Sequence, residues 1–175
     1  MYPIFLLWIL SSISELVQEL QTAIKSTISE KNIGIAFSGG VDSTLLAKLC
    51  NDLGYDVTLL TIGFENSHDI LFAKKINEIM KLPHKIYEIE ENSFYYISSK
   101  IKTKINNDNL SWNENCIAFY YVSKLAQTNN LKKVITANGI APIEFAREIF
   151  KTVELYNEKD IEKWFQLFKN GIGTE

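Results

Sequence analysis

Hydrophobic residues follow two different spacings along this chain. Between residues 12 and 28 they recur every three or four positions, at Ile13, Leu16, Val17, Leu20 and Ile24, which indicates an amphipathic helix. Farther along, short apolar runs predict four strands, over residues 32–38, 56–64, 84–90 and 132–139. Stretches with helical spacing lie between these runs, over residues 43–54, 68–81, 94–105 and 113–127.

The alternation of strands and helices predicts an α/β architecture. A strand, a helix and another strand are expected to make a right-handed crossover, which leaves the two strands parallel. We therefore expect a doubly wound parallel sheet of about four to five strands, covered by helices on both faces and preceded by an N-terminal helix. Residues 1–30 are assigned to that helix and residues 31–175 to the α/β domain. Ligands bind such folds at the carboxyl ends of the strands.

The opening sequence MYPIFLLWIL is more apolar than the helix that follows it. The run is much shorter than the roughly 20 residues that a membrane-spanning helix needs. Neither a basic region nor a small-residue cleavage site accompanies it, so we expect no membrane anchor. The apolar residues from Tyr2 to Trp8 either complete the amphipathic helix or contact a partner subunit, which would make the protein a homodimer.

Composition narrows the class of protein. Of 175 residues, 46% are hydrophobic and 22% are charged, as in a single globular domain with a sizeable core. The net charge of -3 argues against a wide basic surface that binds nucleic acid, although a local basic patch is compatible with it. Cys50 and Cys116 are far apart and lack Cys-x-x-Cys spacing, so we expect two buried thiols in a cytoplasmic protein.

The sequence SGGVDST, residues 38–44, joins the first predicted strand to the next helix. Gly39 and Gly40 can adopt positive φ and have no Cβ atom to obstruct a phosphate, so backbone N–H groups and the helix N-terminus can face an anion. Hydroxyl donors surround them, from Ser38, Ser43 and Thr44. The loop predicts a phosphate-binding cradle. The alternative is a tight turn in which Asp42 or Ser43 caps the helix.

The same loop resembles the SGGxDS(T/S) motif of the PP-loop ATP pyrophosphatases, a superfamily that includes asparagine, NAD and GMP synthetases and several tRNA-modifying enzymes. The resemblance implies the Rossmann-like adenine nucleotide alpha-hydrolase fold. It also implies cleavage of ATP between its α- and β-phosphates, which gives an adenylated substrate and pyrophosphate. In that reading Asp42 binds Mg²⁺–pyrophosphate, and Asp42 and Ser43 take part in catalysis. The ATP-binding loop would consist of Ser38, Gly39, Gly40, Val41, Asp42, Ser43 and Thr44.

Two later segments narrow the resemblance to the synthetase domain of asparagine synthetase. Residues 61–90 are similar to its second strand, the acidic helix start and the following strand. Residues 116–139 are similar to the helix and strand before its second nucleotide loop, and the whole resemblance covers residues 33–140. The nucleotide contacts that it implies are Phe37 and Ile62 at the adenine, and Ala137, Asn138 and Gly139 near the ribose and α-phosphate.

Several residues near these motifs fit a structural role better than a chemical one. As isolated residues, the adenine contacts would be core side chains. His68 and Asp69 fit the N-cap and the acidic first turn of a helix, where the dipole favours them. His84 fits a half-exposed structural residue better than a general base. An aromatic cluster is more typical of a core than of a stacking platform, at Phe119, Tyr120 and Tyr121.

The second nucleotide loop departs from the family pattern. Asparagine synthetases continue with G-E-G-x-D-E-L-F-x-G-Y, whereas residues 137–145 read A-N-G-I-A-P-I-E-F. The family's first Glu assists amide formation and its Asp-Glu pair serves the metal and pyrophosphate, but Asn138 cannot act as a base. Three explanations are open: a degenerate relative, substitution by Glu144, or an acidic loop missing after Ile140. Without such a loop we expect ATP binding with slow adenylate formation.

No glutaminase nucleophile is expected, because the chain begins Met1-Tyr2-Pro3 where glutamine-dependent synthetases carry a cysteine beside the initiator methionine. Nitrogen would come from a separate amidotransferase subunit or from free ammonia, or the acceptor differs. We interpret the chain as an asparagine-synthetase-like ligase that uses ATP and Mg²⁺ to activate a carboxylate or amide of a small-molecule substrate. The alternatives are a non-catalytic nucleotide-binding or regulatory module and a tRNA-modifying enzyme, which would need a basic surface and a reactive cysteine near the loop.

Overall fold

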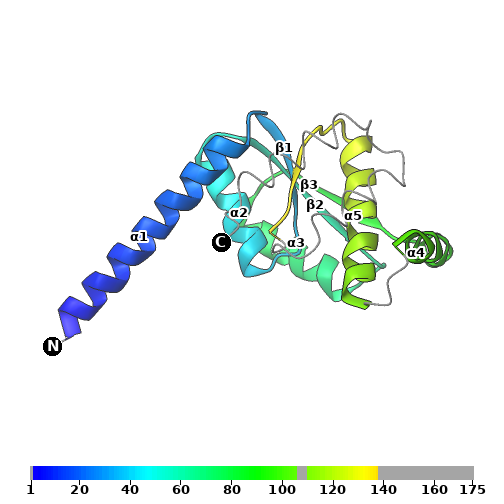
Figure 1. Cartoon of the computed structure of the whole chain (residues 1–175), viewed down its shortest axis with the longest axis horizontal. Coiled ribbons are helices and arrows are strands. Elements are labelled where there is room, and N and C mark those ends of the chain that lie inside the picture. Colours follow the sequence, from blue (N-terminus) through cyan, green and yellow to red (C-terminus); the bar gives the residue numbers. More distant parts are fainter. Residues whose placement is uncertain (1, 106–109, 138–175) are drawn as a thin grey trace.

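Four parallel strands form one sheet in the part of the chain that the computed structural model describes (Figure 1). The described backbone covers residues 2–105 and 110–137, and the described side chains are those of residues 15–104, 110 and 113–137. The strands are β1 (Asn32–Ala36), β2 (Asp56–Gly63), β3 (His84–Glu88) and β4 (Val134–Ile135). Their order across the sheet is β3-β2-β1-β4, and each neighbouring pair is parallel. The predicted parallel sheet is thus confirmed.

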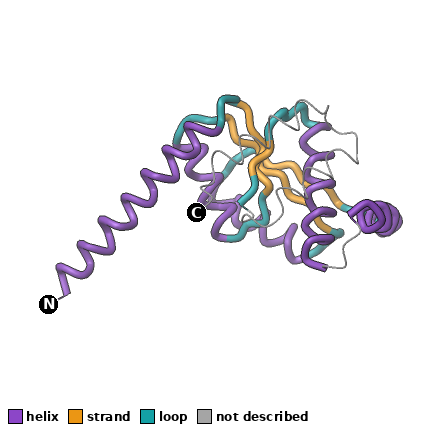
Figure 2. The backbone as a smooth tube through the Cα atoms, in the orientation of Figure 1, coloured by secondary structure: helices purple, strands orange, loops and turns teal. Residues whose placement is uncertain are grey.

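Helices lie on both faces of this sheet, as a doubly wound fold requires (Figure 2). One face is covered by the end of α1 (Tyr2–Thr27), α2 (Val41–Asp52) and α3 (His68–Met80). The other is covered by α5 (Leu110–Thr128), with α4 (Glu91–Ile105) packed beside it. Ile35 and Leu59 belong to the core cluster of the first face, and Leu60 packs with α5 residues in the second.

The burial of the strands agrees with the central place of β1 and β2 in the sheet. Leu59 and Leu60 are consecutive and both fully buried, so both faces of β2 are covered. Ile33 and Ile35 of β1 are fully buried on the α2 face. β3 lies at the edge and its residues are only half-buried or exposed. The carboxyl ends of the two central strands, where ligands bind in this architecture, therefore lead into loops held by a well-packed core.

α1 runs outward from the α/β domain, and its carboxyl-terminal part packs on the core (Figure 1). Val17 and Leu20 contact the core and Ile24 is buried in it, as the helical spacing predicts. Leu16 is expected on the same face but is 58% exposed, because the helix departs from the domain on the N-terminal side of Val17 (Figure 1). The side chain of Ile13 lies outside the described residues. The division at residues 30 and 31 remains a prediction.

The predicted element boundaries differ from the structure by a few residues. The first strand ends at Ala36 rather than at residue 38, because the chain turns into the glycine loop there. β4 has two residues, whereas its predicted run continued to residue 139, beyond the described part of the chain. α4 begins at Glu91 and α5 at Leu110, each three residues before its predicted start. The ends of helices and strands depend on capping and tertiary contacts, which residue spacing does not encode.

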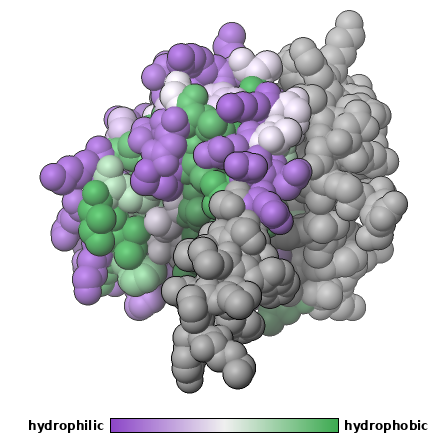
Figure 3. Space-filling model, turned by 90° about the vertical axis from the view of Figure 1, so that its left-hand side faces the viewer, coloured by the Kyte–Doolittle hydropathy of each residue, from purple (hydrophilic) through white to green (hydrophobic). Residues whose placement is uncertain are grey.

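The described surface mixes polar and apolar residues. Seen from the side on which α1 projects, hydrophilic residues are interspersed with smaller hydrophobic groups (Figure 3). Each helix within the described residues is too short or too polar to cross a membrane.

Candidate functional site

The glycine loop leaves the sheet between β1 and α2. The backbone N–H of Phe37, one residue beyond β1, still donates to the carbonyl oxygen of Leu60 at 2.8 Å. The chain then turns through Gly39, whose φ is +77°, and α2 begins at Val41. Gly40 is the N-cap residue and no side chain caps the helix. The alternative in which Asp42 or Ser43 caps the helix is therefore wrong, because both residues already lie inside its first turn.

The two glycines are required for different reasons. At Gly39 the positive φ disfavours other residues, and an added Cβ would lie 3.1 Å from the Cα of Ala73 in α3. At Gly40, φ is -64° and ψ is 163°, an extended conformation that any residue adopts. A Cβ there would meet only the hydroxyl of Ser38, at 3.3 Å. The fold thus explains Gly39 but not Gly40, and a bare Gly40 leaves space at the start of an uncapped helix.

Hydroxyl groups hold the loop in this shape. Ser43 Oγ donates to the Gly40 carbonyl at 3.1 Å, and Thr44 Oγ1 donates to the Gly39 carbonyl at 3.2 Å. Ser38 Oγ accepts the Gly40 N–H at 3.3 Å and lies 3.3 Å from Ser43 Oγ. Because the Ser43 proton goes to a carbonyl, Ser38 is the donor to Ser43. The predicted hydroxyl donors therefore bond within the loop and stiffen it, so that an anion would meet mainly backbone N–H groups.

A pocket of about 330 Å³ opens beside this loop, at the carboxyl ends of β1, β2 and β4. It brings together most of the predicted nucleotide contacts, namely Phe37, Ser38, Gly40, Val41, Asp42, Ser43, Ile62 and Ala137. Gly39 faces α3 and Thr44 bonds to the loop, and neither lines the pocket. Asn138 and Gly139, as well as Ile140 and Glu144, lie outside the described residues. The remaining walls come from Ala36, Leu60, Thr61, Asp69, Ala118, Phe119, Val122 and Thr136.

The pocket has an apolar wall on the α5 side. Phe119 and Val122 face it from α5, and Ile62 faces it from β2. Phe37 lines the pocket but is only 3% exposed, so its ring is mainly a core side chain, as the alternative reading held. The aromatic cluster of α5 divides: Phe119 lines the pocket, whereas Tyr121 is fully buried and stacks on Tyr87 at 5.6 Å. The sequence favours a core role for this cluster over a stacking platform, and spacing cannot tell which member of an aromatic run faces a cavity.

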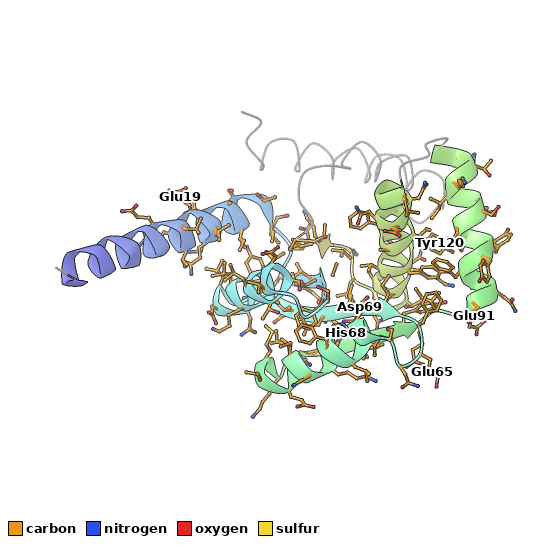
Figure 4. All side chains as sticks on the ribbon, turned by 90° about the horizontal axis from the view of Figure 1, so that it is seen from below. Glu19, Glu65, His68, Asp69, Glu91 and Tyr120 are labelled. Carbon is orange, nitrogen blue, oxygen red and sulfur yellow. The ribbon has the colours of Figure 1, made fainter. Side chains whose placement is uncertain are left out.

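Two carboxylates line the same pocket from neighbouring helix starts. Asp42 lies in the first turn of α2 and Asp69 in the first turn of α3. Figure 4 shows His68 and Asp69 next to each other at the start of α3. The N-cap of α3 is Ser67, so His68 is not the cap, and it stacks on Phe72 instead, with ring centroids 5.6 Å apart. The sequence predicts Asp69 only as an acid in the first turn of a helix. Because this helix follows β2 at the carboxyl edge of the sheet, where ligands bind, the position of Asp69 in the sequence could have indicated a place in the pocket.

The other titratable candidates lie away from the pocket. Burial raises the pKa of Cys50 to about 11 and that of Cys116 to about 12, and both thiols are fully buried, as predicted. Burial, with a smaller contribution from Lys74, lowers the pKa of His84, which bonds to Thr61 rather than facing the cavity. Within the described residues no group of three or more metal-binding side chains forms.

The sequence matches the model of the asparagine synthase family over residues 15–166. It is 30% identical over 133 residues to a putative glutamine-hydrolyzing asparagine synthetase of Methanocaldococcus jannaschii, a match that covers 73% of this chain and 24% of that protein. A tRNA-specific 2-thiouridylase of Treponema denticola is 38% identical over 66 residues, covering 33% of this chain and 18% of that enzyme. The chain therefore spans about a quarter or less of the length of these relatives.

A solved structure shows the same fold. NMN synthetase from Francisella tularensis superposes with a TM-score of 0.52 at 16% identity, over 85% of this chain and 73% of that one. The predicted Rossmann-like adenine nucleotide alpha-hydrolase fold is thus confirmed.

Proposed function

This chain belongs to the asparagine synthase family, and we propose that it binds ATP at the carboxyl edge of its sheet and cleaves it between the α- and β-phosphates. The products would be pyrophosphate and an adenylated carboxylate or amide of a small-molecule substrate. Because the chain spans only part of its relatives, this activity is our inference for the domain in hand.

The proposal rests chiefly on the glycine at position 40, which the fold itself does not require. Its backbone conformation suits any residue and an added Cβ would meet little protein, yet the position is glycine and lines the pocket. The start of α2 also lacks a side-chain cap, so its first N–H groups are available to a ligand. An anion at a helix N-terminus accepts such N–H groups and is favoured by the helix dipole. A phosphate close to Gly40 explains both features.

The two sides of the pocket suit the two ends of a nucleotide. The loop from Ser38 to Thr44 would hold the β- and γ-phosphates. Phe119, Ile62 and Ala137 would lie beside the nucleoside, where apolar walls suit a purine ring. The family resemblance also implies contacts to the ribose and α-phosphate from Asn138 and Gly139, which lie outside the described residues.

The residues present fit a magnesium ion. Asp42 and Asp69 are exposed carboxylates that line the pocket, and Mg²⁺ commonly binds one or two carboxylates together with substrate phosphate oxygens. Asp42 would hold the ion, with Asp69 as the second carboxylate of the pocket. When bound, the ion would offset negative charge on the phosphates.

The chain's own contribution to the reaction is mainly positional and electrostatic. An acceptor oxygen would form a bond to the α-phosphorus while the bond from that phosphorus to the αβ-bridging oxygen breaks, and the electron pair leaves with pyrophosphate. Loop N–H groups would stabilise the charge that develops on pyrophosphate, an effect that is largest for preorganised donors. Ser43 keeps those donors in place through its bond to the Gly40 carbonyl. Nitrogen would then come from a separate amidotransferase subunit or from free ammonia.

The alternatives make different demands on the chain. A thiolating tRNA enzyme would need a reactive cysteine near the loop, but Cys50 and Cys116 are buried with raised pKa values. A regulatory module would bind ATP without forming pyrophosphate.

ATP–pyrophosphate exchange tests the proposal. The wild-type chain should exchange labelled pyrophosphate into ATP when the right member of a panel of amino acids is present, and tRNA serves as the alternative acceptor. Asp42→Asn should lower exchange by about a hundredfold or more and leave the melting temperature nearly unchanged, because Asp42 is exposed and does not cap α2. ATP binding with no exchange for any acceptor would favour the regulatory module. Full exchange in Asp42→Asn would remove Asp42 from the site.

A further inference from the structure

A chain of hydrogen bonds crosses three strands directly behind the glycine loop. Thr61 Oγ1 lies 2.6 Å from the carbonyl oxygen of Phe37 and 2.7 Å from Nε2 of His84. Thr61 is 2% exposed and lines the pocket from β2, and His84 begins β3. Phe37 is the last residue before the cradle begins at Ser38. The three residues connect an edge strand to the phosphate-binding turn.

The distances fix the direction of each bond. A carbonyl oxygen can only accept, so the Thr61 hydroxyl proton goes to Phe37. The hydroxyl has no second proton, and at 2.7 Å a hydrogen must lie between Oγ1 and Nε2. The imidazole therefore donates from Nε2, and Thr61 accepts and donates at once. Burial, with Lys74, lowers the pKa of His84 and so favours a neutral ring, whose single proton the bond to Thr61 assigns to Nε2.

These bonds determine how the chain enters the cradle. The Phe37 N–H donates to Leu60 and the Phe37 carbonyl accepts from Thr61, so both polar groups of this residue are held by β2. Since a trans peptide is planar, fixing the Phe37 carbonyl also fixes the direction of the Ser38 N–H. The Phe37 ring in turn packs edge-on against the His84 ring, with centroids 5.8 Å apart. Thus His84 constrains Phe37 both through Thr61 and by direct packing.

We infer that His84 is a positioning residue for ATP binding, which acts through the Thr61 hydroxyl to orient the peptide between Phe37 and Ser38. This inference rests on the proposed function, because the oriented peptide is the first of the cradle. Preorganised donors bind an anion without a free-energy cost for reorienting themselves. A loop that has lost these bonds should therefore bind ATP more weakly.

Matched variants separate positioning from general stability. His84→Leu removes the donor, His84→Gln retains an amide N–H on a side chain of similar reach, and Thr61→Val removes the hydroxyl with little change of shape. Tyr121→Phe is the control, because it also removes a buried hydroxyl, one that bonds to Ser93 at 3.0 Å in the cluster on the opposite face of the sheet. All variants are made in the full chain.

Three measurements decide the inference: the imidazole tautomer of the wild-type protein by ¹⁵N NMR, the amide shifts of Gly39 and Gly40, and the ATP dissociation constant. We expect the Nε2–H tautomer, shifted glycine amides in His84→Leu and Thr61→Val, and ATP affinity about three- to tenfold weaker in both. His84→Gln should recover most of the affinity. Tyr121→Phe should lower the melting temperature without changing the affinity.

Other results would overturn it. An Nδ1–H tautomer would break the chain of donors, and glycine amides unmoved in both His84→Leu and Thr61→Val would show that the loop does not depend on it. If the wild-type chain binds no ATP, the proposed function fails, and the tautomer and the glycine amides then decide the hydrogen-bonded chain by themselves.

Discussion

Gly39 and Gly40 are adjacent and identical in type, yet the structure uses them differently. Gly39 takes positive φ and packs against the backbone of α3, whereas Gly40 has an ordinary conformation and faces the pocket. The sequence predicts a glycine cradle at this place, because two glycines after a buried strand favour it. It could not separate the two roles, since the approach of Ala73 to Gly39 is a tertiary contact between segments more than thirty residues apart.

The two glycines should respond differently to the same substitution. Gly40→Val should lose little stability but lose measurable ATP binding, because its side chain would project into the proposed phosphate site. Gly39→Val should lower the free energy of unfolding by more than about 2 kcal/mol, from left-handed strain and the clash with α3. Thermal unfolding and calorimetric titration with ATP measure both. If Gly40→Val destabilises the fold as much as Gly39→Val, Gly40 has a structural role that the geometry does not show.

The cysteines give a second prediction at this scale. A thiol reacts as its thiolate, and both Cys50 and Cys116 have raised pKa values and fully buried side chains. The native protein should therefore take up no iodoacetamide at pH 8, whereas both sites should be alkylated in denaturant. Intact-mass spectrometry counts the adducts. Cys50 lies in the helix after the glycine loop. Its rapid alkylation in the native protein would favour the alternative function, a tRNA-modifying enzyme that uses a reactive cysteine.

Among the elements, β4 is the strand with the fewest backbone pairs, and an ion pair secures its start. Lys133 precedes β4 and is 7% exposed, and its Nζ lies 3.1 Å from a carboxylate oxygen of Glu30. Its carbonyl accepts the N–H of Gly34 at 2.8 Å. Ala137, a predicted nucleotide contact, follows β4 by two residues, so this anchor also places one wall of the pocket.

Neutralising Glu30 should lower the stability of the fold more than replacing Lys133 does. Glu30→Gln leaves the Lys133 ammonium without its counter-charge and should lower the free energy of unfolding by about 0.5–1 kcal/mol, because the Glu30 side chain is 41% exposed and solvent screens the pair. Lys133→Met removes the buried charge while keeping an apolar chain of similar length, and it should cost less. Urea unfolding of both variants at pH 7 measures the difference. A larger loss in Lys133→Met would show that the lysine contributes chiefly through other contacts.

The same pair gives a pH dependence with a defined sign. Burial alone would raise the pKa of Glu30, but hydrogen bonds from Lys133, the backbone and Ser29 outweigh it and hold the pKa below its ordinary value of 4.5. A lowered pKa stabilises the folded state above the unfolded pKa, and that contribution is lost as the pH falls through the folded value. The stability gap between wild type and Glu30→Gln should therefore be full at neutral pH and shrink below about pH 4.5. A gap that does not change with pH would mean that Glu30 acts through its shape.

Spacing and turn chemistry account for most of the elements but not for their ends. The runs around Ile35 and Leu59 predicted parallel strands because both were strongly apolar and separated by a helix. The beginning of α4 and the length of β4 depend on tertiary pairing, which spacing does not encode. Asp69 and Phe119 were assigned structural roles for the same reason. Their place on the pocket emerges only when α3 and α5 pack against the sheet.

At the scale of the whole molecule, α1 is the helix that projects from the described α/β domain (Figure 1), and its described side chains contact the core through Val17, Leu20 and Ile24. It extends away from the domain, and its first residues, from Tyr2 to Trp8, have an apolar sequence (Figure 1). We predict that the chain dimerises through this helix, because an apolar helix surface is stabilised by burial against a second copy. Light scattering should give a dimer mass for the chain and a monomer mass after deletion of residues 2–10. The deleted chain should still bind ATP, and a monomeric intact chain would contradict the prediction.

The central claim is that the pocket beside the glycine loop directs cleavage of ATP to the bond between the α- and β-phosphates. The most direct measurement follows ATP labelled in the α- or the γ-phosphate, with Mg²⁺ and the acceptor found by pyrophosphate exchange, and separates the products by chromatography. The account predicts that the first label appears in the adenylated acceptor, and in AMP once added ammonia displaces the adenylate, whereas the second label appears in pyrophosphate. Gly40→Val should give none of these products. Labelled ADP and inorganic phosphate would contradict the account, because they would place the cleaved bond between the β- and γ-phosphates.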